Sequence, residues 1–259
     1  MDVGEVFTLG FPKHTYVTRE NTRATNEVPR VLETGSPIQL VGPEGVGKTS
    51  LVLHYVDRPV LTVPGSTVEE NNDIAWQLFD QLLGMQASGT FTLPINESDR
   101  DEMAIKEKRW VVDDALESGE VVLLFDDFHL LPDGVQVYAA QRLKAHFERG
   151  VSIFITVEEG HRGDLFRANG DLVGRVRSID VPKWTGNNLS KIATKGFDVL
   201  NVTVPDDTVS RLVEMADGSP RKMQRLCLVL CEGLGIREPN SDQRSLDVPE
   251  AVFEELAEE

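Results

Sequence analysis

Residues 40–50 read Leu40-Val41-Gly42-Pro43-Glu44-Gly45-Val46-Gly47-Lys48-Thr49-Ser50 and fill every fixed position of the pattern Gly-x-x-x-x-Gly-Lys-[Ser/Thr]. The apolar run Ile38–Val41 predicts a strand before this segment, and Leu51–Tyr55 predicts the start of a helix after it. A strand, a glycine-rich loop and a helix in this order are the context in which the pattern binds nucleotide phosphates. We therefore call residues 42–50 the phosphate loop.

The residue types of the phosphate loop suit this chemistry. Its glycines allow a backbone with positive φ and a close approach to phosphate oxygens. Successive N–H groups and the positive end of the following helix cradle the phosphates. We expect Lys48 to reach the β- and γ-phosphates of ATP and the Thr49 hydroxyl to bind Mg²⁺. The predicted nucleotide contacts are Gly42, Pro43, Glu44, Gly45, Val46, Gly47, Lys48, Thr49 and Ser50.

Composition and charge limit the classes of protein to which this chain can belong. Its 259 residues allow one large domain or a core with a small second domain, and its 40% hydrophobic content suffices for a buried core. With 26 basic and 43 acidic residues, the net charge of −17 opposes nucleic-acid binding unless basic groups gather locally. Such a surface serves solubility, or it fits a salt-rich cytoplasm in which charges are screened.

The two cysteines, Cys227 and Cys231, lie about one helical turn apart in an apolar stretch. No further cysteine accompanies them, so we expect core thiols in a reducing compartment and neither a disulfide nor a metal site. The N-terminus lacks the basic and apolar regions of a signal peptide, and no apolar run approaches the length of a membrane span. These features predict a cytoplasmic protein that does not interact with membranes.

Predicted strands and helices alternate through most of the chain, which is typical of an α/β domain with a parallel sheet. A polar segment around 89–100 is a candidate partner-binding loop, and residues 1–30 look polar and irregular apart from the first helix. A cap at Ser66 or Thr67 is expected to begin the helix that carries Ile74 and Leu78. The predicted strands are 38–41, 60–63, 121–127, 151–156 and 176–181, and further helices are expected at about 21–33, 101–117, 135–149 and 162–169.

After Pro182 the alternation stops and the apolar spacing predicts helices only. These helices cover about 189–200, 206–216, 220–234 and 248–257. We therefore expect a nucleotide-binding α/β core at residues 1–184 and a small helical domain at residues 185–259, which we call the lid.

A bound Mg²⁺ needs a carboxylate at the end of a neighbouring strand, and Asp126 stands where an apolar strand ends. Asp127 follows at once, and in related ATPases an acidic residue at this position orients or deprotonates the attacking water. Its side chain is one methylene shorter than the glutamate often found there in related ATPases, so hydrolysis is expected to be slow or to wait for a partner. The alternative without a functional role is that both aspartates simply start a turn. At the tip of a later strand, Thr156 is the candidate contact to the γ-phosphate or the water. The alternatives are Glu158 and an ordinary strand end without a role in the site.

Two further segments suggest a family. Gly218-Ser219-Pro220-Arg221 stands at a helix start in the lid, and Thr15-Tyr16-Val17-Thr18-Arg19-Glu20 precedes the phosphate loop. With the five-strand core, the chain resembles the AAA+ ATPases, and most of all the branch that contains archaeal replication-origin-recognition and STAND signalling ATPases. The resemblance implies a parallel sheet in the strand order 5-1-4-3-2, followed by a small helical lid.

The resemblance also implies roles for single residues. Arg221 is expected to sense the γ-phosphate and to couple nucleotide state to the lid, with Pro220 marking the start of its helix. Tyr16, Val17 and Arg19 are expected near the base, although Thr18 replaces the usual glycine. Arg175 lies where such proteins carry an arginine finger that reaches a neighbouring subunit, and Arg177 is the alternative. Without such a role, both arginines would only balance the acidic charge of the surface.

Together these features predict a Mg²⁺- and ATP-dependent ATPase that acts as a switch or an assembly device. The expected partners are further copies of the chain, assembled in a nucleotide-dependent way, and another protein that carries the output, with defence or mobile-element control as a setting by resemblance only. The alternatives are a module that holds ATP with little turnover and a DNA-handling ATPase, which the acidic charge does not favour. An Asn-Lys-x-Asp motif for guanine is absent, which argues against a GTPase.

Overall fold

The computed structural model describes residues 1–19, 22–69, 74–93, 95 and 103–256. The chain forms two compact units. The sheet unit contains Thr22–Gly42 and Leu51–Val181, and the helical unit contains Met1–Asn21, Pro43–Ser50 and Pro182–Glu259. Each unit has a hydrophobic core of its own. In the described part of the chain, no helix has the length and apolar character needed to cross a membrane.

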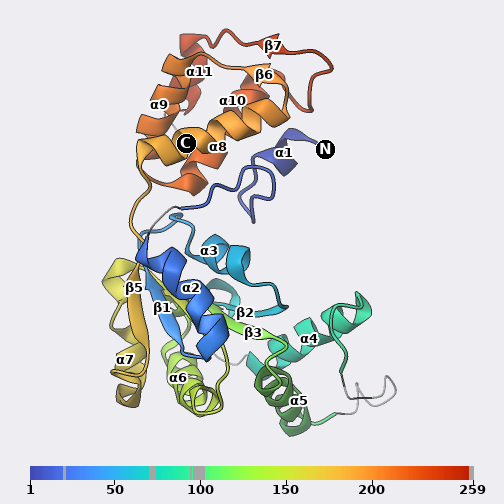
Figure 1. Ribbon diagram of the computed structural model, residues 1–259, viewed down its shortest axis with the longest axis vertical. Helices are drawn as coiled ribbons and strands as arrows, with labels where there is room; N and C mark the ends of the chain where they lie inside the picture. Colours follow the sequence, from blue (N-terminus) through green and yellow to red (C-terminus); the bar gives the residue numbers. More distant parts are fainter. Residues whose placement is uncertain (20–21, 70–73, 94, 96–102, 257–259) are drawn as a thin grey trace. The chain divides into compact units, whose positions relative to one another are not determined.

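Five parallel strands form the centre of the sheet unit (Figure 1). They lie in the order β2-β3-β4-β1-β5, which is the predicted order 5-1-4-3-2 read from the other edge. Every residue of β1 and β4 is buried, as expected for central strands covered on both faces. The strands are β1 (Ile38–Val41), β2 (Val60–Pro64), β3 (Val122–Asp126), β4 (Ile153–Val157) and β5 (Arg177–Asp180).

Helices flank this sheet. Figure 1 shows α4 and α5 side by side, and α4 packs against β2. The helix α3 begins within the phosphate loop and continues into the sheet unit. The helices are α2 (Arg23–Thr34), α3 (Lys48–Tyr55), α4 (Ile74–Ala87), α5 (Ile105–Glu117), α6 (Asp133–Phe147) and α7 (Asp164–Ala168), with short 3-10 turns η1 (Gly65–Thr67), η3 (Phe128–Leu130), η4 (Glu159–His161) and η5 (Gly170–Leu172).

Some predicted helix starts lie elsewhere. Ser66 and Thr67 belong to η1, which ends at the extended Val68, so they do not cap α4, which is described from Ile74 onward. The helix expected from Asp101 begins at Ile105, where the Glu107 carboxylate accepts the N–H of residue 104. Some predicted positions lie outside the described residues. They are the helix starts at residues 21 and 101, the helix end at residue 257, and residues 94 and 96–100 of the polar segment. The helix expected from residue 21 is described from Arg23 onward.

Four longer helices form most of the helical unit, together with the short α1. Two dipeptides also pair as a small parallel sheet, so the prediction of helices only after Pro182 was incomplete. These elements are α1 (Val3–Val6), α8 (Gly186–Val199), α9 (Asp206–Ala216), α10 (Pro220–Gly233), α11 (Glu250–Leu256), β6 (Val202–Thr203) and β7 (Arg244–Ser245). Both cysteines lie in α10 as buried free thiols, which confirms their prediction as core residues.

The first residues of the chain are ordered by packing rather than irregular. Asp2 caps α1 with its carboxylate, and Val3 and Val6 are buried in the helical core. Phe7 is fully buried, and its ring lies so close to Gly196 of α8 that a Cβ there would be 2.1 Å from the ring. The capping aspartate is visible in the sequence, but the pairing of Phe7 with a glycine far along the chain is not.

Candidate functional site

The glycines of the phosphate loop are each required by the backbone. Gly42 follows β1 and donates its N–H to Val157 O at 3.2 Å. A Cβ at Gly42 would lie 2.3 Å from Val181 O, so no other residue fits. Gly45 and Gly47 have φ of 67° and 89°, a region that side chains strongly disfavour. The loop therefore has the strongly curved backbone that the motif predicts.

Lys48 and Thr49 form the first turn of α3. The Lys48 side chain is buried, and its Nζ donates to Pro43 O at 3.0 Å. The ammonium is thus turned toward the loop of which it is part. Thr49 is partly buried beside it. A buried cation at a helix N-terminus provides an electropositive environment suited to an anion.

The lid motif contacts the phosphate loop within the helical unit. Gly45 O accepts hydrogen bonds from the Arg221 backbone N–H at 3.2 Å and from Ser219 Oγ at 3.3 Å. The Arg221 guanidinium pairs with Glu44 at 3.1 Å, with the two side chains 56% and 74% exposed. An exposed pair of this kind contributes little stability. Ser219 also caps α10, and Pro220 is its first residue, as the motif predicts.

Arg19 is a second anchor of the phosphate loop. Its guanidinium is buried and donates to Val46 O and to Pro182 O, each at 2.8 Å. Burial lowers the pKa of Arg19 to about 10, so the side chain stays charged at neutral pH. Its Cζ lies 4.8 Å from the centre of the Trp184 ring, and Trp184 Nε1 donates to Val46 O at 3.0 Å. The sequence does not predict this role of Trp184, because a single tryptophan near a proline forms no recognisable motif.

Tyr16 and Val17 lie on the same N-terminal segment. The Tyr16 ring stacks on Phe11 with 5.8 Å between centroids, and Tyr16 O accepts from Lys195 of α8 at 2.9 Å. Val17 is buried in the core of the helical unit. These contacts attach the segment to a helix of the lid.

The sheet unit supplies the acidic residues. Because β4 pairs with both β1 and β3, the carboxyl ends of these three strands lie next to one another. Asp126 ends β3, and the fully buried Thr156 of β4 donates through Oγ1 to Asp126 Oδ1 at 2.8 Å. The same hydroxyl accepts the backbone N–H of Asp127 at 2.8 Å. One threonine thus holds both aspartates at the edge of the sheet where β1 leads into the phosphate loop.

Asp127 has a left-handed backbone, with φ of 51° and ψ of 55°. Aspartate tolerates this conformation better than most residues, at a cost of about 1 kcal/mol. Its carbonyl lies against η1, since a Cβ on Gly65 would be 2.1 Å from Asp127 O. Glu158, the alternative to Thr156, is 3.6 Å from His129 Nε2, whereas Thr156 is the residue that bonds to Asp126.

The two candidate arginine fingers differ in their surroundings. Arg177 forms an ion pair with Glu27 of α2 at 2.6 Å, and that carboxylate is only 12% exposed. Arg175 is 43% exposed, lies 3.8 Å from Glu148 and stands over the ring of Phe147 at 6.0 Å. Both arginines lie on the sheet unit and pair with a carboxylate, and the pair of Arg177 is the closer one. Arg177 is 48% exposed, as much as Arg175, so the assignment of Arg175 as the arginine finger stays a prediction.

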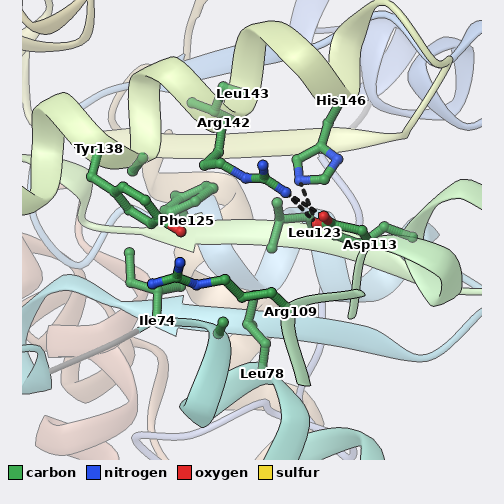
Figure 2. A pocket seen from close by; sticks show the side chains of 13 residues that line it. Ile74, Leu78, Arg109, Asp113, Leu123, Phe125, Tyr138, Arg142, Leu143 and His146 are labelled. Carbon is green, nitrogen blue, oxygen red and sulfur yellow. Dashed lines mark hydrogen bonds and ion pairs between the residues drawn. The ribbon is translucent and has the colours of Figure 1, made fainter. Parts of the chain in front are cut away.

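A pocket in the sheet unit lies among α4, α5, α6 and β3 (Figure 2). Asp113 faces Arg142 at 2.6 Å and His146 at 3.5 Å, as the dashed lines in Figure 2 show. The hydrogen bond to Asp113 raises the pKa of Arg142, and burial lowers the pKa of His146. These charges are compensated within the protein and tie α5 to α6.

The oxygen atoms at the candidate site suit magnesium. Mg²⁺ prefers hard oxygen ligands and commonly takes only one or two from the protein. Asp126 provides a carboxylate that Thr156 holds in place, and Thr49 provides a hydroxyl. Among the described residues, no group of three or more His, Cys, Asp or Glu side chains could hold a metal ion. Asp126 of the sheet unit and Thr49 of the helical unit are therefore each a donor of the type that Mg²⁺ prefers.

No protein-family model matches the chain. Among curated proteins, the gas vesicle ATPase GvpN1 of Halobacterium salinarum is 37% identical over 60 residues. That match covers 22% of this chain and 17% of the length of the relative.

Solved structures with the same fold cover most of the chain. A Walker-type ATPase of Pyrococcus abyssi has a TM-score of 0.61 and 18% identity, over 84% of this chain and 71% of that chain. The ORC2 protein of Aeropyrum pernix, solved as ADPNP and ADP complexes, has a TM-score of 0.63 and 14% identity, over 98% and 71%. At these identities the likeness shows the fold alone, and the sheet of that fold has the predicted strand order 5-1-4-3-2.

Proposed function

We propose that this chain binds Mg²⁺ and ATP and acts as a nucleotide-dependent switch, whose output is a change in the lid. The motifs predict the contacts to the nucleotide and the metal ion. The phosphate loop binds the phosphates, Asp126 and Thr49 bind the metal ion, and Tyr16, Val17 and Arg19 lie near the base.

One observation supports a switch more than any other. The lid holds the phosphate loop directly, because Ser219 and the backbone of Arg221 both donate to Gly45 O. A Cβ on Gly45 would lie 2.8 Å from Ser219 Oγ, so the approach is as close as a glycine allows. A change in the phosphate loop on nucleotide binding therefore reaches the lid through these bonds.

The arginine of the motif has a partner that ATP can replace. Arg221 pairs with the exposed Glu44, and this ion pair is weak enough to exchange for the more strongly charged γ-phosphate. Arg221 is thus placed to change partners when ATP binds. Such an exchange gives ATP and ADP different effects on the lid, because only ATP carries the third phosphate.

Hydrolysis needs positioning and charge neutralisation rather than a covalent step on the protein. Magnesium, when bound, neutralises charge on the phosphate oxygens. Lys48 supplies positive charge at the phosphates, and the Asp127 carboxylate orients or deprotonates the attacking water. Thr156 fixes Asp126 and the Asp127 backbone at the same time. With Arg175 as the finger, a neighbouring copy completes the site, so turnover is expected to depend on assembly.

A second function has a specific observation in its favour. Asp127 is short, and its left-handed backbone is anchored by Thr156, which limits how far its carboxylate can reach. A chain with this residue can hold ATP with little turnover and act by recruiting a protein partner. Defence or mobile-element control is a setting suggested by family resemblance alone, and the charge of −17 does not favour DNA as the partner.

The test combines molar mass with turnover. Size-exclusion chromatography with light scattering is run without nucleotide, with ADP and with ATP, at low and high salt, while phosphate release is assayed on the same samples. We expect ATP to increase the mass and phosphate to be released. A monomer that binds ATP without releasing phosphate would favour the recruiting module. Lys48→Ala is the control, and normal ATP binding by that variant would overturn the assignment of the site.

A further inference from the structure

The carbonyl of Val46, inside the phosphate loop, accepts two hydrogen bonds from outside the loop. Arg19 Nη2 donates at 2.8 Å and Trp184 Nε1 at 3.0 Å. Val46 is 1% exposed and Arg19 is 6% exposed, so these bonds are shielded from water. One donor is charged, and a charge-assisted bond is about twice as strong as a neutral one. The orientation of this carbonyl is therefore strongly restrained.

A restrained carbonyl also restrains the amide that follows it. The C=O of Val46 and the N–H of Gly47 belong to one planar trans peptide and point in opposite directions. Gly47 has φ of 89° and no side chain to limit rotation of this peptide. Without the two donors, the peptide can turn over and present its oxygen where an anion is to bind.

We propose that Arg19 and Trp184 are positioning residues for the phosphate site. By holding the Val46 carbonyl away from the phosphates, they direct the Gly47 N–H toward them. This inference rests on the proposed function, because it requires that the loop bind phosphate. The benefit is preorganisation. The Val46–Gly47 peptide is already ordered before the phosphates bind, so the entropy cost of ordering it does not reduce the affinity.

Arg19 also joins this peptide to the segment that enters the lid, because its second nitrogen donates to Pro182 O at 2.8 Å. The planar fork of a guanidinium reaches two carbonyls at once, whereas the ammonium of a lysine is a single point of charge. Trp184 stands against the guanidinium face and adds a donor to the same carbonyl. The two side chains thus act on one oxygen atom, and each supports the other.

The decisive variant is Trp184→Phe. It removes the indole N–H and keeps an aromatic face for Arg19, so the packing changes little. The matched control is Trp110→Phe, because Trp110 is 59% exposed on α5 of the sheet unit. A second variant, Arg19→Lys, keeps the charge and removes the fork. Thermal melting without ligand checks that all three variants are folded.

The readout is isothermal titration calorimetry with ATP and with inorganic tripolyphosphate. For Trp184→Phe we expect both ligands to bind about three- to tenfold more weakly, the range for loss of one hydrogen bond. Arg19→Lys should lose at least as much affinity for both ligands, and Trp110→Phe should bind them as the wild type does. Equal binding by Trp184→Phe and the wild type would overturn the inference. So would a loss for ATP alone, because Trp184 would then contact the base.

The two proposals fail in different ways. If the wild-type protein binds neither ATP nor tripolyphosphate, the proposed function is wrong. The positioning role of Arg19 and Trp184 is then wrong as well, because it requires that the loop bind phosphate. If the wild type binds both and Arg19→Lys and Trp184→Phe bind them equally well, only the positioning role is wrong. Support for the inference requires a parallel loss for both ligands in folded variants.

Discussion

Thr156 donates a hydrogen bond of 2.8 Å to the carboxylate of Asp126, 30 residues earlier in the chain. The same Thr156 oxygen accepts the N–H of Asp127 at 2.8 Å. A buried hydroxyl therefore holds the proposed metal-binding carboxylate and the backbone of the proposed catalytic residue together. The relationship lies between neighbouring strands β3 and β4, where parallel strands bring their carboxyl ends to one edge.

Replacing Thr156 with valine tests this arrangement. Valine has nearly the same shape but leaves Asp127 N–H and Asp126 Oδ1 without this partner, at a cost of about 1–3 kcal/mol in stability. We expect phosphate release to fall by at least about tenfold, while ATP binding changes by less than about threefold. Thr156→Ser restores the hydroxyl and should restore most of the rate. Equal rates for the valine and serine variants would refute the role of the hydroxyl.

The arginine finger is tested by mixing two inactive variants. Asp127→Asn should bind ATP but lose hydrolysis, and Arg175→Ala should lose hydrolysis only in assembled protein. A mixture of both should regain part of the activity, because some interfaces then combine an intact Asp127 with an intact Arg175. Phosphate release is measured across mixing ratios.

The control for this experiment is Arg177→Ala. That variant breaks the ion pair with the mostly buried Glu27, so it should lower the melting temperature without taking part in complementation. Complementation by Arg177→Ala and not by Arg175→Ala would reverse the assignment of the two arginines.

Gly196→Ala should destabilise the helical unit. A Cβ at Gly196 would lie 2.1 Å from the buried ring of Phe7, and overpacking of this kind costs about 1–3 kcal/mol. Gly84 of α4 is the matched control, because a Cβ there meets nothing within 4 Å. Gly84→Ala should stabilise its helix by up to about 1 kcal/mol. Thermal melting of both variants checks the prediction, and a rise in melting temperature for Gly196→Ala would show it to be wrong.

Cys227 and Cys231 should resist thiol reagents in the folded protein. Burial raises the pKa of Cys231 from an ordinary 9.0 to about 12 and raises that of Cys227 well above its ordinary value. The reactive thiolate is therefore scarce at pH 8 until the chain unfolds. We expect no fast reaction with a disulfide reagent in buffer and two reactive thiols in guanidinium chloride.

The same shifts predict a loss of stability in alkali. Above pH 9 the unfolded chain ionises its thiols while the native protein keeps them protonated, so the free energy of unfolding falls. Fast reaction of both thiols in native buffer would contradict the buried placement. Cys231→Ser should reduce the number of reactive thiols in guanidinium chloride to one.

The local features of this protein can be predicted from its amino-acid sequence. The apolar runs marked the five strands, and the fixed positions of the glycine-rich pattern marked the phosphate loop, because both patterns are properties of short segments. These fixed positions are Gly42, Gly47, Lys48 and Thr49. The strand order followed from a family resemblance based on such motifs. Helix starts were less well predicted, as at Ser66, because several nearby residues can cap a helix and packing selects among them.

The contacts between distant groups, in contrast, depend on the tertiary structure. Trp184 and Arg19 share the carbonyl of Val46, and Phe7 packs on a glycine of α8, yet none of these pairings has a local signature. The hydroxyl of Thr156 likewise acquires its two partners only when β3 and β4 pair. Such contacts depend on chain closure over long separations and on the shape of a packed core, which no short pattern records.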